Sequence, residues 1–119
     1  MTIYVDRDGG EWITTDVRGT LMAKRIIWEG DHDVRAALYR MPAGMRVEPH
    51  RHDKWVNVSV LEGHMLVEQA GLPPRNMPAG SSYFVLPGET HAETATIDTL
   101  VLVVQGEDRG LQAKANTAR

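Results

Sequence analysis

Glycine and proline interrupt this chain so often that no long helix fits between them. The turn-forming segments recur at short intervals: Gly9-Gly10, Pro42-Ala43-Gly44, Pro73-Pro74, Pro78-Ala79-Gly80 and Pro87-Gly88. Between them lie short runs rich in Val, Leu, Ile, Tyr and Trp, and no long window shows a 3.6-residue apolar period. Many short apolar runs between turns are typical of an all-β domain, built as a barrel or a sandwich.

The runs between the turns are the expected strands: Glu11–Asp16, Leu21–Trp28, Val34–Met41, Trp55–Leu61, His64–Gln69, Ser82–Leu86, His91–Thr94 and Thr99–Gln105. In Trp55–Leu61 three valines alternate with Asn57 and Ser59, which predicts a half-buried strand. Thr99–Val104 is almost continuously apolar, which predicts a strand covered on both faces. Ala70–Gly80 is expected to be a loop near the opening of an interior site. The polar, Ala-rich tail 106–119 is expected to be a frayed end or a short helix with little function.

Composition excludes several classes of protein. A chain of 119 residues suits one domain, 1–119, and 42% apolar with 24% charged residues is typical of a folded globular protein. The absence of cysteine excludes disulfides, thiolate metal sites and thiol nucleophiles. A net charge of −3 argues against nucleic acid as the main partner. We expect no membrane association and a cytoplasmic location, because neither a long apolar run nor a signal peptide is visible.

Three histidines are the candidate metal ligands. His50 and His52 are two residues apart, so in an extended strand both imidazoles face the same side. A neutral imidazole is the commonest metal ligand in proteins. A His-x-His pair alone is weak support for a metal site, but His91 follows Pro87-Gly88 farther along the chain.

The glycines around these histidines strengthen the metal hypothesis. The chain reads Gly44-x5-His50-x-His52-x10-Gly63 and then Gly80-x7-Gly88-x2-His91. This arrangement resembles the two motifs of the cupin superfamily, which bracket a small β-barrel with metal ligands in its mouth. The resemblance implies a cupin-type double-stranded β-helix, or jelly-roll barrel, with a core of about residues 34–105.

The chain departs from the cupin pattern at the anionic ligand. Val56, or Asn57 with the longer spacing, stands where the family has a glutamate, and Ala95 stands where it has an asparagine. The resemblance therefore implies a site of three histidines holding one divalent ion, with iron favoured for catalysis and zinc, nickel or manganese as alternatives. Three neutral ligands leave the charge of the ion uncompensated and coordination positions open.

Other side chains are candidates for supporting roles. Glu93 shares the strand face of His91 and is a candidate fourth ligand, acceptor for a histidine N–H, or general base. Tyr39 is a candidate proton-handling and substrate-binding residue. Strand parity places Tyr39, Met41, Val56 and Val58 on the pocket wall, which favours an apolar or aromatic substrate with a chelating polar end. Glu48 and His64 are weaker alternatives as ligands, because proline steers the first to a loop and parity turns the second away.

Within the cupins, three-histidine sites are associated with iron(II) dioxygenases, including those that cleave diketones. The resemblance thus implies a metal-dependent dioxygenase acting on a small chelating substrate such as a diketone or hydroxyaromatic compound. The alternatives are a non-redox isomerase, cyclase or lyase, and a non-catalytic sensor like the cupin domains of zinc-binding anti-sigma proteins. A homodimer is expected, because a domain this short buries only a modest fraction of its surface.

Overall fold

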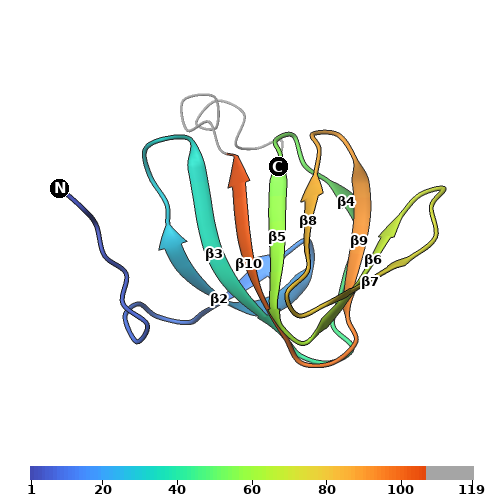
Figure 1. Ribbon diagram of the computed structural model, residues 1–119, viewed down its shortest axis with the longest axis horizontal. Helices are drawn as coiled ribbons and strands as arrows, with labels where there is room; N and C mark the ends of the chain where they lie inside the picture. The colour runs from blue at the N-terminus through green and yellow to red at the C-terminus, as the bar shows by residue number, and fades with distance from the viewer. Residues whose placement is uncertain (107–119) are drawn as a thin grey trace.

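Ten antiparallel strands make up the fold in the computed structural model, which describes residues 1–106 (Figure 1). The strands are β1 (Ile13–Val17), β2 (Thr20–Trp28), β3 (Val34–Met41), β4 (Arg46–Arg51), β5 (Val56–Glu62), β6 (His64–Gln69), β7 (Arg75–Pro78), β8 (Ser82–Val85), β9 (Thr90–Ala95) and β10 (Thr99–Gly106). None of the described residues forms a helix able to cross a membrane. The prediction of an all-β jelly-roll barrel is confirmed.

Two sheets face each other and enclose the core. The larger sheet has the order β1-β2-β3-β10-β5-β8, and the smaller has the order β4-β9-β6-β7. Several neighbours are distant in sequence, as in the pairing of β3 with β10 and of β4 with β9. This crossing of the chain between layers brings the strand that carries His50 beside the strand that carries His91.

The core follows the alternation visible in the sequence. Val56, Val58 and Val60 are buried, whereas Asn57 and Ser59 between them are half-buried. Burying each valine stabilises the fold by about 1.5–3 kcal/mol. On β10 the prediction of burial on both faces is wrong, because Leu100 and Leu102 on the outer face stay partly exposed.

All eight expected strands occur, with ends displaced by at most two residues. Two further strands, β4 and β7, lie where the sequence predicts none, and β7 falls within the segment 70–80 that was expected to be a loop. Of the predicted tail 106–119, Gly106 is the last residue of β10, and residues 107–119 lie outside the described part of the chain.

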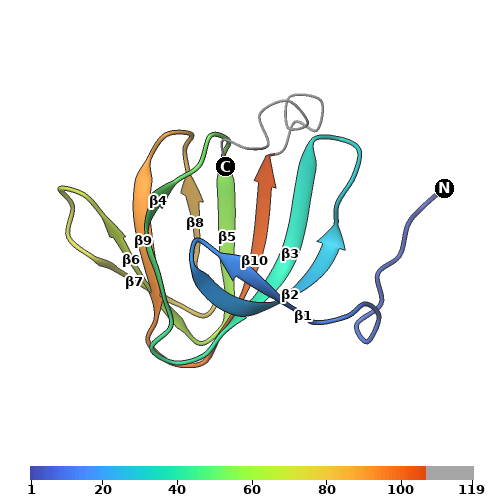
Figure 2. The same ribbon diagram turned by 180° about the vertical axis from the view of Figure 1, so that it is seen from behind.

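The β1–β2 hairpin closes one side of the barrel (Figure 2). Its tip, Arg18-Gly19, has positive φ angles of 54° and 90°, which is the backbone conformation of a tight two-residue hairpin turn. The Thr20 hydroxyl donates to the carbonyl of Arg46 over 2.8 Å, so the hairpin is tied to β4 in the opposite sheet. This contact bridges the gap between the two sheets beside the histidines.

Candidate metal centre

Three imidazoles converge at one end of the barrel. His50 lies on β4, His52 follows the end of that strand, and His91 lies on β9. One nitrogen from each ring lies within 4.8 Å of the others. The ring centroids are 4.9 Å apart for His50 and His52, 4.4 Å for His50 and His91, and 5.6 Å for His52 and His91. The structure therefore brings together the three predicted ligands.

The backbone fixes the tautomer of His50. Its Nδ1 lies 2.7 Å from the carbonyl oxygen of Glu48. Because a carbonyl oxygen only accepts, the proton must be on Nδ1, and the lone pair of Nε2 is left for an ion. Such an N–H to carbonyl contact is the usual way in which a metal-binding imidazole is oriented.

His91 carries the observation that most favours an ion. Its side chain is 1% exposed, and neither ring nitrogen has a hydrogen-bond partner among the described residues. A buried polar atom left without a partner costs about 1–3 kcal/mol. Coordination of a cation by one of these nitrogens relieves that cost, so the residues present fit a divalent ion.

Burial keeps the imidazoles in the form that binds metals. Desolvation lowers the pKa of both His50 and His91 from the usual histidine value. Both rings are therefore neutral near pH 7, and protons compete little with a cation for their lone pairs. Neutral nitrogen donors suit zinc, iron, nickel and copper better than the hard ions magnesium and calcium.

Glu93 lies beside the three histidines without belonging to their group. Its Oε1 is 3.8 Å from His50 Nε2 and 3.7 Å from His91 Nδ1, and its side chain is 14% exposed. Its Oε2 accepts a short hydrogen bond from the hydroxyl of Tyr83 on β8. Desolvation raises the pKa of Glu93, while the Tyr83 bond and the His50 charge lower it. Two imidazoles with lowered pKa values therefore face a carboxyl group with a raised pKa.

Tyr83 is a site residue that the sequence reasoning missed. Desolvation raises the pKa of its hydroxyl well above the usual value, and Glu93 raises it further. The hydroxyl therefore stays protonated and remains a hydrogen-bond donor. Tyr83 is two residues before the buried Val85, so the parity argument applied to β5 would also have placed it inward.

An apolar cavity of about 80 Å³ leads to the histidines. Its wall includes all four residues predicted to bind substrate, Tyr39, Met41, Val56 and Val58, together with Glu93. Burial raises the pKa of the Tyr39 hydroxyl, with a smaller opposing effect of Arg35. The volume is well below the roughly 300–1,000 Å³ of pockets for drug-sized ligands. It suits the chelating end of a substrate, and the roles of these side chains stay predictions.

The two weaker ligand candidates lie outside the cluster. Glu48 is exposed and its carboxylate is 3.3 Å from Arg46 Nε. The Nδ1 of His64 is 2.6 Å from the hydroxyl of Thr96, away from the three converging rings. The site therefore consists of three converging histidines and one adjacent carboxyl group.

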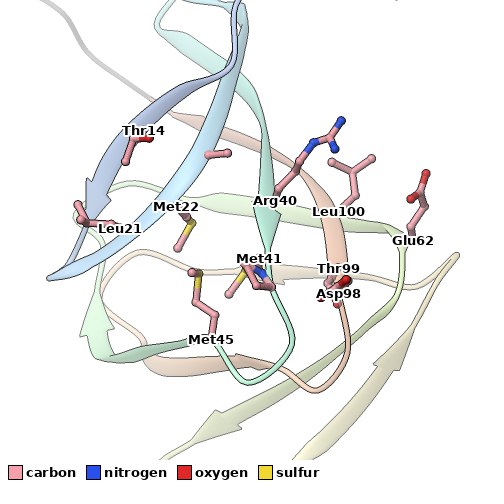
Figure 3. A pocket seen from close by; sticks show the side chains of 12 residues that line it. Thr14, Leu21, Met22, Arg40, Met41, Met45, Glu62, Asp98, Thr99 and Leu100 are labelled. Atoms are coloured by element: carbon pink, nitrogen blue, oxygen red, sulfur yellow. The ribbon is translucent and has the colours of Figure 1, made fainter.

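A second, larger cavity of about 590 Å³ is separated from the first by Met22 and Met41, which line both. In Figure 3 the side chains of Met22, Met41 and Met45 lie close together on one side of it, and Arg40, Leu100 and Glu62 lie on the other. None of its lining residues is a histidine. The smaller cavity, not the larger one, therefore contains the candidate chemistry.

Solved structures with the same fold include KdgF from Halomonas sp., with a TM-score of 0.76 and 21% identity over 92% of this chain and 99% of that one. A predicted oxalate decarboxylase from Thermotoga maritima has a TM-score of 0.78 and 20% identity over 89% and 100% of the two chains. An RmlC-like cupin from Shewanella frigidimarina has a TM-score of 0.69 and 20% identity over 83% and 86%. At these identities the likeness shows the fold alone.

No curated protein matches the sequence. The profile of the ChrR cupin-like domain matches residues 1–108, which is most of the chain. That match agrees with the barrel and with the histidines at its open end. The chain therefore belongs to the ChrR cupin-like domain family of the cupin superfamily.

Proposed function

We propose that this protein holds one divalent metal ion on His50, His52 and His91 and acts as an iron(II) dioxygenase on a small chelating substrate. The observation that carries the proposal is the convergence of three imidazoles, with both nitrogens of the buried His91 unpaired, on an apolar cavity. Three neutral ligands leave coordination positions open, which is the arrangement that non-haem iron enzymes need.

When bound, iron(II) would supply redox chemistry toward dioxygen and a Lewis acid for the chelating end of a substrate. The protein's own groups do the rest. His50 and His91 orient the ion through rings fixed by packing, and Val56 and Val58 line the cavity and exclude water. A dry wall strengthens every electrostatic interaction at the site.

Glu93 and Tyr83 are placed to manage a proton. Because burial raises the pKa of Glu93, its carboxyl group carries a proton more readily than an exposed glutamate does. Tyr83 holds Oε2, so Oε1 is the oxygen turned toward the histidines. Glu93 can therefore take a proton from an enolisable substrate or return one to a product.

The first test is metal content. Protein purified without added metal is expected to contain about one ion per chain by elemental analysis. His50→Ala and His91→Ala should lose most of it, whereas the matched variant His64→Ala should retain it, because His64 lies outside the cluster. Equal metal content in all four proteins would contradict the site.

The second test is oxygen consumption. Iron-loaded protein is mixed with a panel of diketones, catechols and hydroxyaromatic acids in a sealed oxygen-electrode cell. Uptake of dioxygen that requires His91 and ceases when the iron is replaced by zinc supports the dioxygenase. Iron-loaded protein that consumes no oxygen with any member of the panel contradicts it.

Two specific observations favour other functions of the same site. The neighbour described as a predicted oxalate decarboxylase favours a non-redox lyase, in which substrate turns over without oxygen uptake. The family match to the ChrR cupin-like domain favours a binding module, which would hold zinc tightly and turn over nothing. Oxygen uptake and product analysis on the same samples separate all three.

A further inference from the structure

A positively charged side chain contacts the segment that carries two of the histidines. Arg18 is the first residue of the β1–β2 turn, and its Nη2 donates to the carbonyl of Arg51 over 3.2 Å. Arg51 directly precedes His52, and Val17, the neighbour of Arg18, lines the metal cavity. The hairpin tip therefore carries its guanidinium to the side of the cavity where the histidines lie.

The turn holds this side chain in place. Arg18 has a φ of 54° and Gly19 a φ of 90°, and the Thr20 hydroxyl ties the next residue to the Arg46 carbonyl over 2.8 Å. A guanidinium carries five N–H donors in a rigid plane, and the bond to Arg51 uses a single one. The remaining donors form a ready partner for a carboxylate or an enolate.

The charge of Arg18 lies near the candidate ligands. Its guanidinium contacts the carbonyl of Arg51, the residue between His50 and His52. A positive charge at this position favours an anion bound beside the histidines.

Two carboxyl groups also lie near the histidines. Glu89 is engaged by the Leu86 N–H at 2.7 Å and by the Gln69 amide at 3.4 Å, and Glu93 is engaged by the hydroxyl of Tyr83. Arg35 adds a second cation, since it pairs in register with Gln105, which lines the cavity. With three neutral imidazoles, the charge of a divalent ion also stays uncompensated.

We propose that Arg18 is a specificity residue that binds the negatively charged end of the substrate, so that the substrate is a small chelating anion such as a dicarboxylate or an enolate. The inference rests on the proposed metal site and names the class of molecule that this site accepts. One end of the substrate would chelate the ion, and an oxygen at its other end would accept a hydrogen bond from the Arg18 guanidinium.

The test uses cobalt(II)-loaded protein, whose visible spectrum reports ligand binding without turnover. Malonate is the anionic probe and malonamide its neutral counterpart of the same shape. Wild-type protein should bind malonate more tightly than malonamide. Arg18→Gln should weaken malonate binding by roughly tenfold, the usual size of one charge-assisted hydrogen bond, and change malonamide binding by less than about twofold.

The matched control is Arg75→Gln, which removes the same charge from exposed β7, in the other sheet from the hairpin. It should leave both affinities unchanged.

Equal malonate affinity in wild-type and Arg18→Gln proteins, or equal weakening for malonate and malonamide, overturns the role of Arg18. Elemental analysis and thermal melts of the same samples show that each variant is folded and loaded. If wild-type protein holds no cobalt, the proposed metal site fails and this inference fails with it.

Discussion

At the scale of single residues, the unusual feature is a buried carboxyl group that faces two imidazoles. Glu93 meets His50 and His91 through Oε1 and Tyr83 through Oε2. Tyr83 belongs to the larger sheet and Glu93 to the smaller, so their hydrogen bond joins the two layers. An ionised carboxylate here has few donors to replace water, which is why burial raises its pKa.

This pKa predicts how stability depends on pH in the metal-free protein. Since the pKa of Glu93 is raised on folding, its contribution is fully present below the unfolded pKa and is lost as pH rises through the folded one. The Glu93→Gln variant cannot ionise at this position, so it does not lose stability in this way as the pH rises. Urea unfolding from about pH 4.5 to about pH 8 should show the free energy of unfolding of the wild type falling relative to the variant.

Because the charges of His50 and Glu93 affect each other, the difference reports the titration of this pair and not of Glu93 alone. The control Glu62→Gln changes an exposed carboxylate and should give a curve parallel to that of the wild type. A constant difference between wild type and Glu93→Gln at every pH would show that Glu93 does not titrate abnormally.

The sequence was sufficient to predict that the three histidines belong to one site, but not the network around them. The spacing of His50, His52 and His91 can be recognised in the sequence. The hydrogen bond between Tyr83 and Glu93 joins the two sheets, so it depends on how the layers pack. Arg18 is a turn residue in sequence, and its position near the histidines follows only from the hairpin contacting β4.

At the scale of elements, the turn between β5 and β6, where the chain crosses from the larger sheet to the smaller, depends on one glycine. Gly63 has a φ of 90°, and a Cβ added there would overlap the carbonyl of Asp98 and the side chain of Thr99. The Thr99 hydroxyl also accepts from the His64 N–H over 3.0 Å. The turn is therefore packed directly against the start of β10, without room for a side chain.

Replacing this glycine should be costly. Gly63→Ala adds both a strained backbone and an overlap, so the free energy of unfolding should fall by about 2–4 kcal/mol. Gly80→Ala is the matched control, because Gly80 has a φ of 91° and nothing within 4 Å of its would-be Cβ. It should cost only about 1–2 kcal/mol in urea unfolding. Equal losses would show that the packing against β10 is unimportant.

The elements that the sequence concealed are those with charged or proline residues inside them. β4 contains Arg46, Glu48 and Pro49, which hide the alternation, and β7 ends at Pro78. Pro49 is tolerated because β4 is an edge strand with an irregular register between Val47 and His50. By contrast, the valines of β5 alternate with polar residues, and this pattern predicts the strand from the sequence alone.

At the scale of the whole molecule, the outer face of the larger sheet carries exposed apolar side chains among polar ones. Leu38, Leu102 and Leu100 lie on it partly exposed, and Phe84 is 54% exposed beside Trp55, with ring centroids 5.7 Å apart. The continuous apolar run of β10 predicts cover on both faces, and within residues 1–106 its outer face stays partly exposed. We propose that a second copy of the chain packs there and forms a homodimer.

Light scattering after size-exclusion chromatography checks this proposal. Wild-type protein should have twice the mass of one chain, and Leu102→Glu should shift it to the mass of one chain, because a buried charge opposes the packing of apolar faces. Leu72→Glu, a change at an exposed residue that follows β6, should leave the mass unchanged. Wild-type protein with the mass of a single chain would contradict the dimer.

The placement of the ligands on one side of the barrel has a consequence for metal exchange. His50 and His91 are cross-strand neighbours in the smaller sheet, and His52 directly follows β4. The two layers are also joined by hydrogen bonds that need no ion, from Thr20 to Arg46 and from Tyr83 to Glu93. Loading and loss of the ion are thus uncoupled from unfolding, and a chelator should strip this protein while leaving the barrel intact, unlike a zinc finger, which melts when its metal leaves.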